Sequence, residues 1–504
     1  MSISAREWLA AACVVGLYLL AMYPSPEFPA YNSDDGSWFI TLALNLLEQG
    51  RYSTDTFPGF PYGHHATWPP IFPLMLAGVI SVAGLSWAAM KILTVSLGLV
   101  GLYFWWRLFA REPHGRVAVL ALALSPAYFL FAHHPMAEMP FMVLCAVTLV
   151  VLEKAENPGL AFAAGMLAAV TFLTRGYAAA FLPAGLLWFL LLRGQPWPHR
   201  VFMAAAFVVP LVIAILGWRA YTAQILATQP LDAITAHFGN GVGLLGGFLQ
   251  SPAAHIRNLY WFELRYPLHF VIPALPLKAV LSSTPLFFLS ALLTGLALVG
   301  WLSRLRDRLT PGDLWVPCTA LLLYGVAAVN QGHSVRYWIM LVPFGFVYLL
   351  AGAEAIGRIL RFPGLGRAAG VALIVSMATG MGLHLWDPDR LRFADPFWRD
   401  YRDLAVWARK NIPSGTPVVA PSAHKFYAVT GLPVYPPEQV DRLRVSDSSV
   451  VVVLCGESDR IPKPHRIWCR TALAGIRPIQ RAGGLSLFRL PKERLATEAP
   501  SFSG

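Results

Sequence analysis

The sequence predicts a polytopic α-helical membrane protein that carries a small α/β domain after its last membrane span. Three observations support this fold class. The 504 residues are 56% hydrophobic and 13% charged, with a mean hydropathy of +0.54, well outside the usual range for soluble globular proteins. Apolar runs of roughly 20 residues, the length that crosses a hydrocarbon core, recur from Trp8 to about Leu385. After residue 387 the apolar runs give way to short strands and amphipathic helices.

The apolar runs predict about 11 to 12 transmembrane helices. The expected spans are residues 8–24, 91–110, 117–132, 139–153, 159–173, 177–192, 201–218, 284–302, 314–330, 337–355 and 368–386. The first run resembles a signal peptide, but no small-x-small cleavage site follows it, so we expect an uncleaved span. A further apolar piece, residues 70–86, has prolines at its start and is expected to be short or tilted rather than a full span.

The basic residues predict the orientation. The formal net charge is +12, but the lysines and arginines lie in short clusters between spans rather than on one face, which argues against a nucleic-acid partner. Short cytoplasmic loops are enriched in such residues. If residues 70–86 do not cross, four clusters fall on one side, which is then cytoplasmic: Arg107, Arg111 and Arg116; Arg193 and Arg200; Arg304, Arg306 and Arg308; Arg358, Arg361 and Arg367. This predicts an inner-membrane protein whose residues 25–69, 133–138, 219–283, 331–336 and C-terminal part lie outside the cytoplasm.

The C-terminal part predicts an extracytoplasmic α/β domain over residues 387–492, followed by a disordered tail over 493–504. "WRDYRDLAVWARKNIP" has the pattern of an amphipathic helix, and "TPVVAPSA", "SSVVVVLC" and "LSLFRL" have the pattern of short buried strands. Cys455 and Cys469 are the only cysteines outside apolar segments, in a compartment where disulfides persist. We expect a bridge between them, formed as the polar loop folds back; the alternative is two unpaired thiols.

Five motifs occur in the order found in C-type (GT-C) membrane glycosyltransferases. "SDDGSWFITLALNLLEQGRY" resembles the family's Asp-Glu-x-x-Tyr/Phe signature, and "WPPIFPLML" resembles its Lys-Pro-Pro-Leu element. "SPAYFLFAHHPMAEMPFMVL" resembles the segment with the second acid, "GMLAAVTFLTRGYAAAFLPA" the Gly-Leu-x-x-Leu-Thr-Lys/Arg helix pair, and "VRYWIMLVPF" the Arg-Tyr before a late span. The chain thus resembles the family-39-like branch, which holds protein O-mannosyltransferases and the lipid A aminoarabinose transferase, over about residues 5–390 and in its C-terminal layout.

The resemblance implies a GT-C fold and an inverting transfer of a sugar from a polyprenyl-phosphate donor to an acceptor on the extracytoplasmic face. The acceptor can be a protein, a lipid or a polysaccharide. Two positions depart from the family: the acidic doublet is Asp-Asp, and Trp68 stands where a basic residue is usual. The second departure removes one phosphate contact, which His64 or His65 would replace.

The acids are candidate catalytic residues. Asp34 is expected to be the general base for the acceptor hydroxyl, although an aspartate before a helix is also a good N-cap. Asp35 either holds Asp34 through hydrogen bonds or is solvated. Glu138 lies at the start of a span, where a lone carboxylate is costly; it is expected to orient the acceptor or bind the sugar, or else to be an acid that the helix dipole stabilises.

The cations are candidate phosphate ligands. Arg175 lies between two short apolar helices, and its planar guanidinium suits a phosphate; the alternative is an arginine that snorkels to the interface. Arg336 has a similar position. The pairs His64-His65 and His133-His134 are candidate substrate-binding residues that could together ligate a metal, but no cysteine or third carboxylate completes a recognisable site. No metal and no other cofactor is therefore expected.

Two other functions compete with the enzyme. A transporter or flippase of lipid-linked sugars would also have many spans with buried charge, but such proteins typically show inverted repeats or interrupted helices, and no internal repeat is found. A scaffold would not need acids in the first loop. "GVGLLG", residues 241–246, spells a dinucleotide-binding fingerprint, but no strand precedes it and a loop is expected there.

Overall fold

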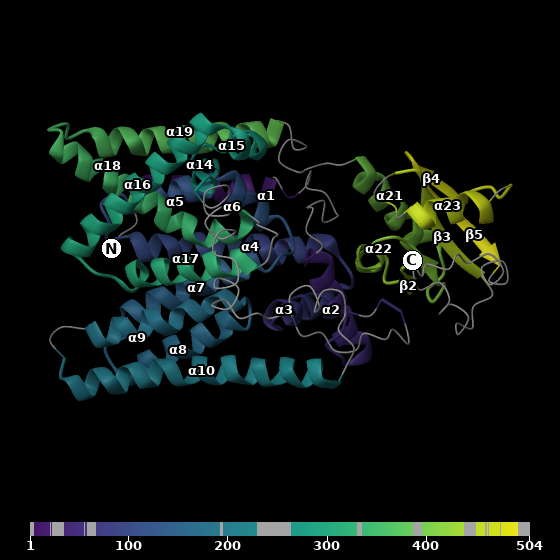
Figure 1. Ribbon diagram of the computed structural model, residues 1–504, viewed down its shortest axis with the longest axis horizontal. Helices are drawn as coiled ribbons and strands as arrows, with labels where there is room; N and C mark the ends of the chain where they lie inside the picture. The colour runs from purple at the N-terminus through teal and green to yellow at the C-terminus, as the bar shows by residue number, and fades with distance from the viewer. Residues whose placement is uncertain are drawn as a thin grey trace.

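The computed structural model describes residues 5–20, 22, 35–54, 56–57, 67–191, 195–228, 264–329, 335–386, 396–437, 450–458, 461, 463–473 and 475–491. Most of these residues are helical, and a small sheet lies near the C-terminus, as the sequence predicts. Figure 1 shows a long bundle of helices with the C-terminal domain at one end. The predicted tail, residues 493–504, lies outside the described residues.

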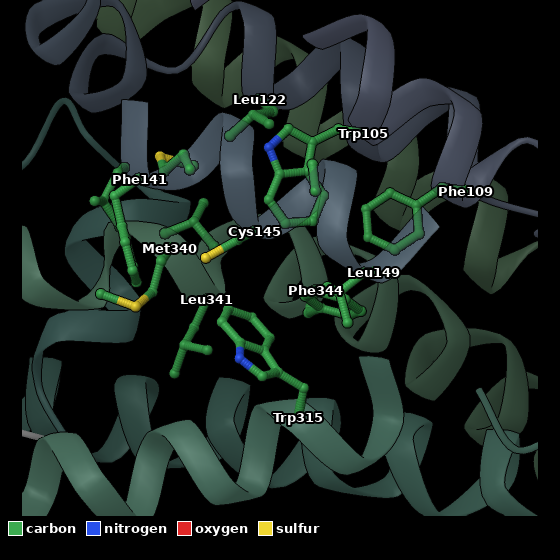
Figure 2. Close-up of a cluster of buried hydrophobic side chains, with 14 of the residues drawn as sticks. Trp105, Phe109, Leu122, Phe141, Cys145, Leu149, Trp315, Met340, Leu341 and Phe344 are labelled. Carbon is green, nitrogen blue, oxygen red and sulfur yellow. The ribbon is translucent and has the colours of Figure 1, made fainter. Parts of the chain in front are cut away.

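The bundle consists of long helices joined by short helical pieces. Its helices are α1 (Ala5–Leu20), α4 (Trp87–Phe109), α5 (Gly115–Ala123), α6 (Pro126–Ala132), α7 (Glu138–Glu153), α8 (Pro158–Phe172), η1 (Gly176–Ala180), α9 (Phe181–Leu191), α10 (Trp197–Thr228), α14 (Tyr266–Val271), α15 (Leu277–Ser282), α16 (Thr284–Asp307), α17 (Pro311–Val329), η3 (Val335–Leu341), α18 (Val342–Ile359) and α19 (Leu365–Trp386). Large apolar side chains from α4, α5, α7, α17 and the η3–α18 region fill the middle of the bundle, among them Trp105, Cys145, Trp315 and Phe344 (Figure 2).

Within the described residues, five helices are long and apolar enough to cross a membrane: Trp87–Phe109, Trp197–Thr228, Thr284–Asp307, Arg336–Ile359 and Leu365–Trp386. The predicted span 117–132 is instead two helices, α5 and α6, bent by 58° where Ser125 and Pro126 interrupt the helix. Four shorter apolar helices accompany them. The count of about 11 to 12 crossings therefore stays a prediction.

The apolar piece at residues 70–86 forms the short helix α3 (Ile71–Ala83). Its 13 residues span about 20 Å at 1.5 Å per residue, less than the roughly 30 Å of a hydrocarbon core. Its buried side chains include Phe72, Leu76 and Ile80, which pack with α2 (Asp35–Gln49) and the C-terminal domain rather than with the centre of the bundle. The sequence-based expectation of a short segment seated in protein agrees with this geometry.

Close helix packing depends on small residues. A Cβ at Gly300 of α16 would lie 1.9 Å from the Tyr348 carbonyl oxygen, and one at Gly352 of α18 would lie 2.0 Å from the Leu296 carbonyl oxygen. Only glycine fits at these two positions. The backbones of α16 and α18 therefore touch, an arrangement typical of helices packed in membranes.

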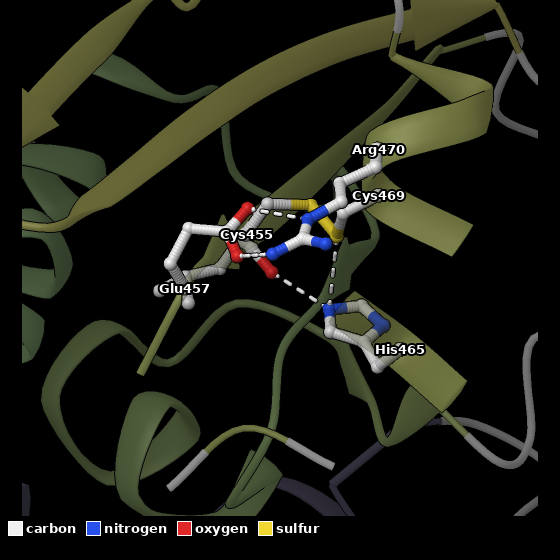
Figure 3. The surroundings of a disulfide bond; sticks show 6 residues. Cys455, Glu457, His465, Cys469 and Arg470 are labelled. Carbon is white, nitrogen blue, oxygen red and sulfur yellow. Dashed lines mark hydrogen bonds and ion pairs between the residues drawn. A yellow bond between two sulfur atoms is a disulfide. The ribbon is translucent and has the colours of Figure 1, made fainter. Parts of the chain in front are cut away.

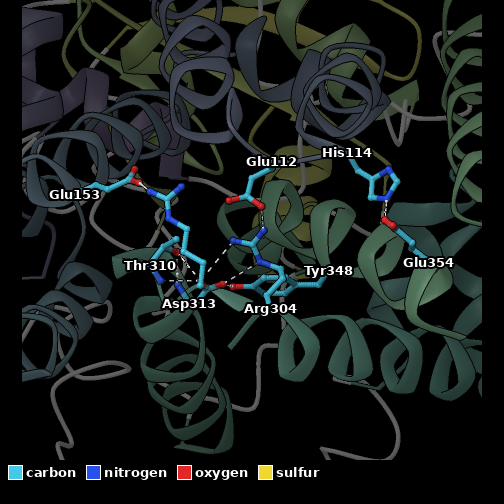
Figure 4. A network of polar contacts seen from close by, with 9 residues as sticks. Glu112, His114, Glu153, Arg304, Thr310, Asp313, Tyr348 and Glu354 are labelled. Carbon is cyan, nitrogen blue, oxygen red and sulfur yellow. Dashed lines mark hydrogen bonds and ion pairs between the residues drawn. The ribbon is translucent and has the colours of Figure 1, made fainter. Parts of the chain in front are cut away.

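Ion pairs join the ends of six helices, α4, α5, α7, α16, α17 and α18, at one end of the bundle (Figure 4). Arg304 of α16 contacts Glu112, after α4, and also the buried Asp313 of α17, with Nε 3.3 Å from Oδ1. Further pairs join Arg308 to Glu153 and His114 to Glu354, each at 2.6 Å. Arg304 and Arg308 belong to one of the four predicted basic clusters. Two other clusters lie beside the paired acids in the sequence, with Arg111 directly before Glu112 and Arg358 one turn after Glu354. Because α4 starts against the C-terminal domain's core and ends here, the network lies at the opposite end of the bundle.

The C-terminal domain is a mixed five-stranded sheet with helices. Its strands are β1 (Val418–Val419), β2 (Val434–Tyr435), β3 (Val450–Gly456), β4 (Gln480–Ala482) and β5 (Leu485–Pro491), in the order β2-β1-β3-β5-β4. The pairs β1–β2 and β1–β3 are parallel, and β3–β5 and β4–β5 are antiparallel. The helices are α21 (Pro396–Asn411), α22 (Ala423–Thr430) and α23 (Lys463–Ala472). The predicted helix and three strands are present; α22, α23, β2 and β4 were not predicted.

The disulfide between Cys455 and Cys469 is confirmed (Figure 3). It joins β3 to α23 with 6.0 Å between the Cα atoms. The segment before Cys469, predicted as a loop, is in fact the start of α23, which places Cys469 one turn after His465. Nε2 of His465 contacts the Leu454 carbonyl oxygen at 2.8 Å. Burial lowers the pKa of His465, while this bond acts in the opposite direction. The other three cysteines are free.

Helices α2 and α3 share one hydrophobic core with the C-terminal domain. Phe39, Leu42 and Phe72 are buried in the same cluster as Tyr401, Phe426 and Leu485. The side-chain hydroxyl of Thr56 donates to the Val434 carbonyl, and the Val434 N–H donates to the Thr56 carbonyl. Helices α2 and α3 and Thr56 are thus held against the C-terminal domain.

Candidate active site

The candidate site lies where the two hydrophobic cores meet. Ala137 is buried in the core that α2 and α3 form with the C-terminal domain, while Met139 is buried in the core of the bundle. Glu138 stands between them as the first residue of α7. A carboxylate at this position is favoured by the positive end of the helix dipole, but it is also 4% exposed and needs a partner.

Two arginines from distant segments surround Glu138. Nη2 of Arg175 donates to Glu138 Oε1 at 2.6 Å, and Nε of Arg336 lies 4.0 Å from the same oxygen. Arg175 immediately precedes η1 in an extended conformation, and Arg336 lies in η3. The two side chains are buried, at 7% and 6% exposure. The structure therefore brings together three of the residues that the sequence singled out.

This burial decides against one alternative. A snorkelling arginine would extend its guanidinium to the water-exposed interface, whereas Arg175 is buried against Glu138. The geometry leaves both alternatives for Glu138 open. It begins a helix, as an acid stabilised by the helix dipole would, and it also contacts two other candidate site residues. Its contact with Arg175 indicates that it orients a guanidinium, a role that the sequence alone did not indicate.

Aromatic rings line the cluster. Cζ of Arg175 lies 5.8 Å from the ring centroid of Phe39, and Cζ of Arg336 lies 5.0 Å from that of Tyr337. Nη2 of Arg336 donates to the Tyr337 hydroxyl at 3.1 Å, and the rings of Tyr177 and Tyr337 are 5.4 Å apart. At these distances the ring faces attract the two guanidinium groups.

Phe39 also connects the cluster to the predicted acids. Helix α2 begins at Asp35, one turn before Phe39, so the start of α2 lies near Arg175. Asp34, His64, His65 and the glycine-rich residues 241–246 lie outside the described residues, and the catalytic roles of Asp34 and Asp35 stay predictions.

The remaining histidine pair is bound to the main chain. Nδ1 of His133 lies 2.8 Å from the Phe129 carbonyl oxygen, and Nε2 lies 3.0 Å from that of Tyr18. Nδ1 of His134 lies 2.8 Å from the Leu130 carbonyl oxygen. These contacts make His133 a link between α1 and α6. The geometry gives no support to its predicted role in binding substrate, because both ring nitrogens already meet carbonyl oxygens.

Among the described residues, one group of three potential metal ligands lies together: Cys455, His465 and Cys469. Two of them form the disulfide, so this group is explained by the covalent bond.

Lys91 was missed. It lies inside α4 and is 4% exposed, one turn after Trp87 and therefore at the end of the bundle that carries Glu138. The signal was present in the sequence: "WAAMKILTV" places one lysine within an apolar helix, and an ionisable residue inside a membrane span is expected to serve function.

No protein-family model and no curated protein sequence matches the chain. Similar solved structures include two crystal structures of ArnT from Cupriavidus metallidurans, one bound to undecaprenyl phosphate and one in the apo state. The bound structure has a TM-score of 0.59 and a sequence identity of 13%, and the match covers 99% of this chain and 100% of that ArnT chain. The apo structure has a TM-score of 0.57 and a sequence identity of 14%, and the match covers 98% of this chain and 99% of that ArnT chain. ArnT is the lipid A aminoarabinose transferase, a GT-C enzyme. The chain therefore has the fold of ArnT, which confirms the resemblance at the level of the fold.

The buried pair predicts strong energetic coupling. Glu138→Gln and Arg175→Gln are each expected to destabilise the protein by about 3–5 kcal/mol, because each leaves a buried charge without its partner. The double variant should lose less than the sum, with a coupling above about 1 kcal/mol. Denaturation in detergent measures all four proteins. The matched control is Glu153→Gln with Arg308→Gln, a half-exposed pair at the opposite end, for which coupling of at most about 1 kcal/mol is expected. Equal coupling at both ends would contradict the prediction.

Proposed function

We propose that this protein is an inverting glycosyltransferase that moves a sugar from a polyprenyl-phosphate donor to an acceptor on the extracytoplasmic face of the membrane. One observation carries the proposal: Glu138, Arg175 and Arg336 converge in a buried cluster in a chain with the fold of ArnT, one of whose structures is bound to undecaprenyl phosphate. Buried ionisable groups in such a protein are costly and mark a functional site.

The two arginines are suited to the leaving phosphate. A guanidinium presents five N–H donors in a planar fork that matches the oxygens of a phosphate, and Nη2 of Arg175 donates to Glu138. Glu138 and the neighbouring rings hold this fork in one orientation before substrate arrives. Charge that develops on the departing polyprenyl phosphate then meets fixed cations, so little reorganisation is needed during the reaction.

The acids at the start of α2 supply the other half of the reaction. Asp34 removes the proton from the acceptor hydroxyl as its oxygen attacks the anomeric carbon, and polyprenyl phosphate leaves from the opposite face with the bonding electrons. Asp35 supports Asp34. The product has the inverted configuration. The sugar and the acceptor stay open, since a protein, a lipid or a polysaccharide can each present the hydroxyl.

The phosphate role of Arg175 is testable by binding. Arg175→Ala is expected to weaken the affinity for undecaprenyl phosphate by at least about tenfold, since a charge-assisted hydrogen bond is lost. Arg175→Lys should recover only part, because an ammonium lacks the planar fork. Titration of the purified protein measures the affinity, with Arg308→Ala at the opposite end of the bundle as the control. Unchanged affinity in Arg175→Ala rejects the assignment.

The base is testable by turnover. Asp34→Asn keeps the shape and capping ability of the side chain but removes its basicity, so turnover should fall by about two to four orders of magnitude. Release of undecaprenyl phosphate from its sugar-linked forms, with native membrane extract as acceptor, reports the reaction whatever the sugar. Asp403→Asn, on the exposed side of α21, is the control. A transporter or flippase would be far less sensitive to Asp34→Asn, and near-normal turnover rejects the enzyme mechanism.

The orientation is testable by labelling. Pro113 and Ser414 are both exposed, and they lie at opposite ends of the molecule, the first beside the ion-pair network and the second in the C-terminal domain. In intact cells an impermeant maleimide should modify Ser414→Cys, and it should modify Pro113→Cys only after permeabilisation. The unsubstituted protein controls for its own cysteines. The reverse pattern would place the site on the cytoplasmic face.

A further inference from the structure

The first turn of α22 lies against the first turn of α2. The rings of His424 and Trp38 are stacked, with centroids 4.1 Å apart and planes within 9° of parallel. Trp38 lies three residues after Asp35, where α2 begins. The C-terminal domain therefore touches the first turn of α2.

The turn that presents His424 is itself fixed by α21. The hydroxyl of Tyr401 donates to the carbonyl oxygens of Pro421 and Ser422, the latter at 3.2 Å. Ser422 has a φ of 53°, in the left-handed region that a serine rarely adopts. Next to His424, Nζ of the buried Lys425 lies 3.5 Å from the ring centroid of Trp398. Helices α21 and α22 thus hold the turn rigidly, and the imidazole has a defined position.

A second contact fixes α2 further along its length. The hydroxyl of Tyr427 donates to Asn45 Oδ1 at 3.0 Å and lies 3.3 Å from Glu48 Oε2. Nδ2 of Asn45 donates to the Ser53 carbonyl oxygen at 2.9 Å. Contacts at Trp38 and at Asn45, two turns apart, determine both the position of α2 and its rotation about its own axis. The C-terminal domain, together with α3 in the same core, therefore sets the direction in which the first turn of α2 points.

We propose that α22 is a positioning element of the active site, and that His424 acts by holding Trp38, so that the first turn of α2, which begins at Asp35, keeps its place beside Arg175. The proposal rests on the proposed function. His424 is a positioning residue and does not touch substrate. The bundle supplies the cations that bind the donor phosphate, whereas α22 controls only the alignment of the base. Loss of the stack should therefore lower turnover and leave donor affinity unchanged.

The parallel rings indicate which property of His424 holds Trp38 in place. Stacking at this distance depends on a flat ring and its dispersion contacts, so a phenyl ring can replace the imidazole, and a methyl group cannot. A misplacement of the reacting groups by about 1 Å can cost a factor on the order of 100 in rate.

The experiment compares His424→Ala, His424→Phe and Tyr435→Leu in the purified full-length protein. Turnover is measured as release of undecaprenyl phosphate, and affinity is measured with undecaprenyl phosphate itself. We expect His424→Ala to lower turnover by about 10- to 100-fold with affinity unchanged, and His424→Phe to restore most of it. Tyr435→Leu removes a second stack between the same two parts of the chain, on Phe57 at 3.9 Å, and should lower thermal stability without a comparable loss of turnover.

Three results would overturn the inference: full turnover in His424→Ala, a parallel loss of donor affinity, or an equal loss of turnover in Tyr435→Leu. If His424→Ala does not fold, the same comparison is made at Trp38. Trp38→Phe keeps a flat ring on which His424 can stack, Trp38→Leu does not, and the turnover of the two variants is compared. The two proposals fail separately. An active Asp34→Asn rejects the proposed function, whereas an inactive Asp34→Asn with a fully active His424→Ala rejects only the positioning role.

Discussion

The ion pair between Glu138 and Arg175 is the contact on which the arrangement of the site depends. Removing two charges from water costs several kcal/mol per ion, and their attraction offsets this only when the geometry is good and further hydrogen bonds are made. The pair therefore forms only if the fold brings distant segments of the chain together. The start of α7, the turn before η1 and the start of η3 must all reach one point, and the hydrophobic cores on either side keep that point dry.

The two ends of the bundle use charge differently. At the far end, Arg308 and Glu153 are partly solvated, and such a pair contributes at most about 1 kcal/mol, whereas the buried Asp313 pairs with Arg304 and accepts hydrogen bonds from Thr310 and Tyr348. These pairs join helix ends, and their basic residues oppose passage through a membrane. At the near end, Glu138 and both arginines are buried. Both ends thus bury charge, and the function is assigned to the near end because its buried charges are the residues that the family resemblance singled out.

The sequence predicted what depends on local pattern. Apolar length predicts helices, short apolar runs rich in valine and leucine predicted β1, β3 and β5, and the family resemblance together with their positions near span ends predicted Glu138, Arg175 and Arg336. The Cys455–Cys469 bridge was predictable because only two cysteines lie outside the apolar segments. The stack of Trp38 on His424 was not predictable, since 386 positions separate the two residues and each looks like an ordinary surface ring in its own segment. The bend between α5 and α6 at Pro126 was likewise not predictable, because hydropathy does not distinguish one span from two short helices.

A transfer reaction at a membrane surface has to align two substrates that arrive by different routes. Under the proposed function, the donor diffuses in the membrane plane and reaches cations that the bundle holds. The base, Asp34, directly precedes α2 in the sequence, and the core of α2 is shared with the C-terminal domain. Phe39 belongs to that second core and also contacts Arg175. The relative position of base and phosphate ligand is consequently set by how the second core seats on the bundle. A substitution in this interface can therefore change catalysis without touching a charged residue.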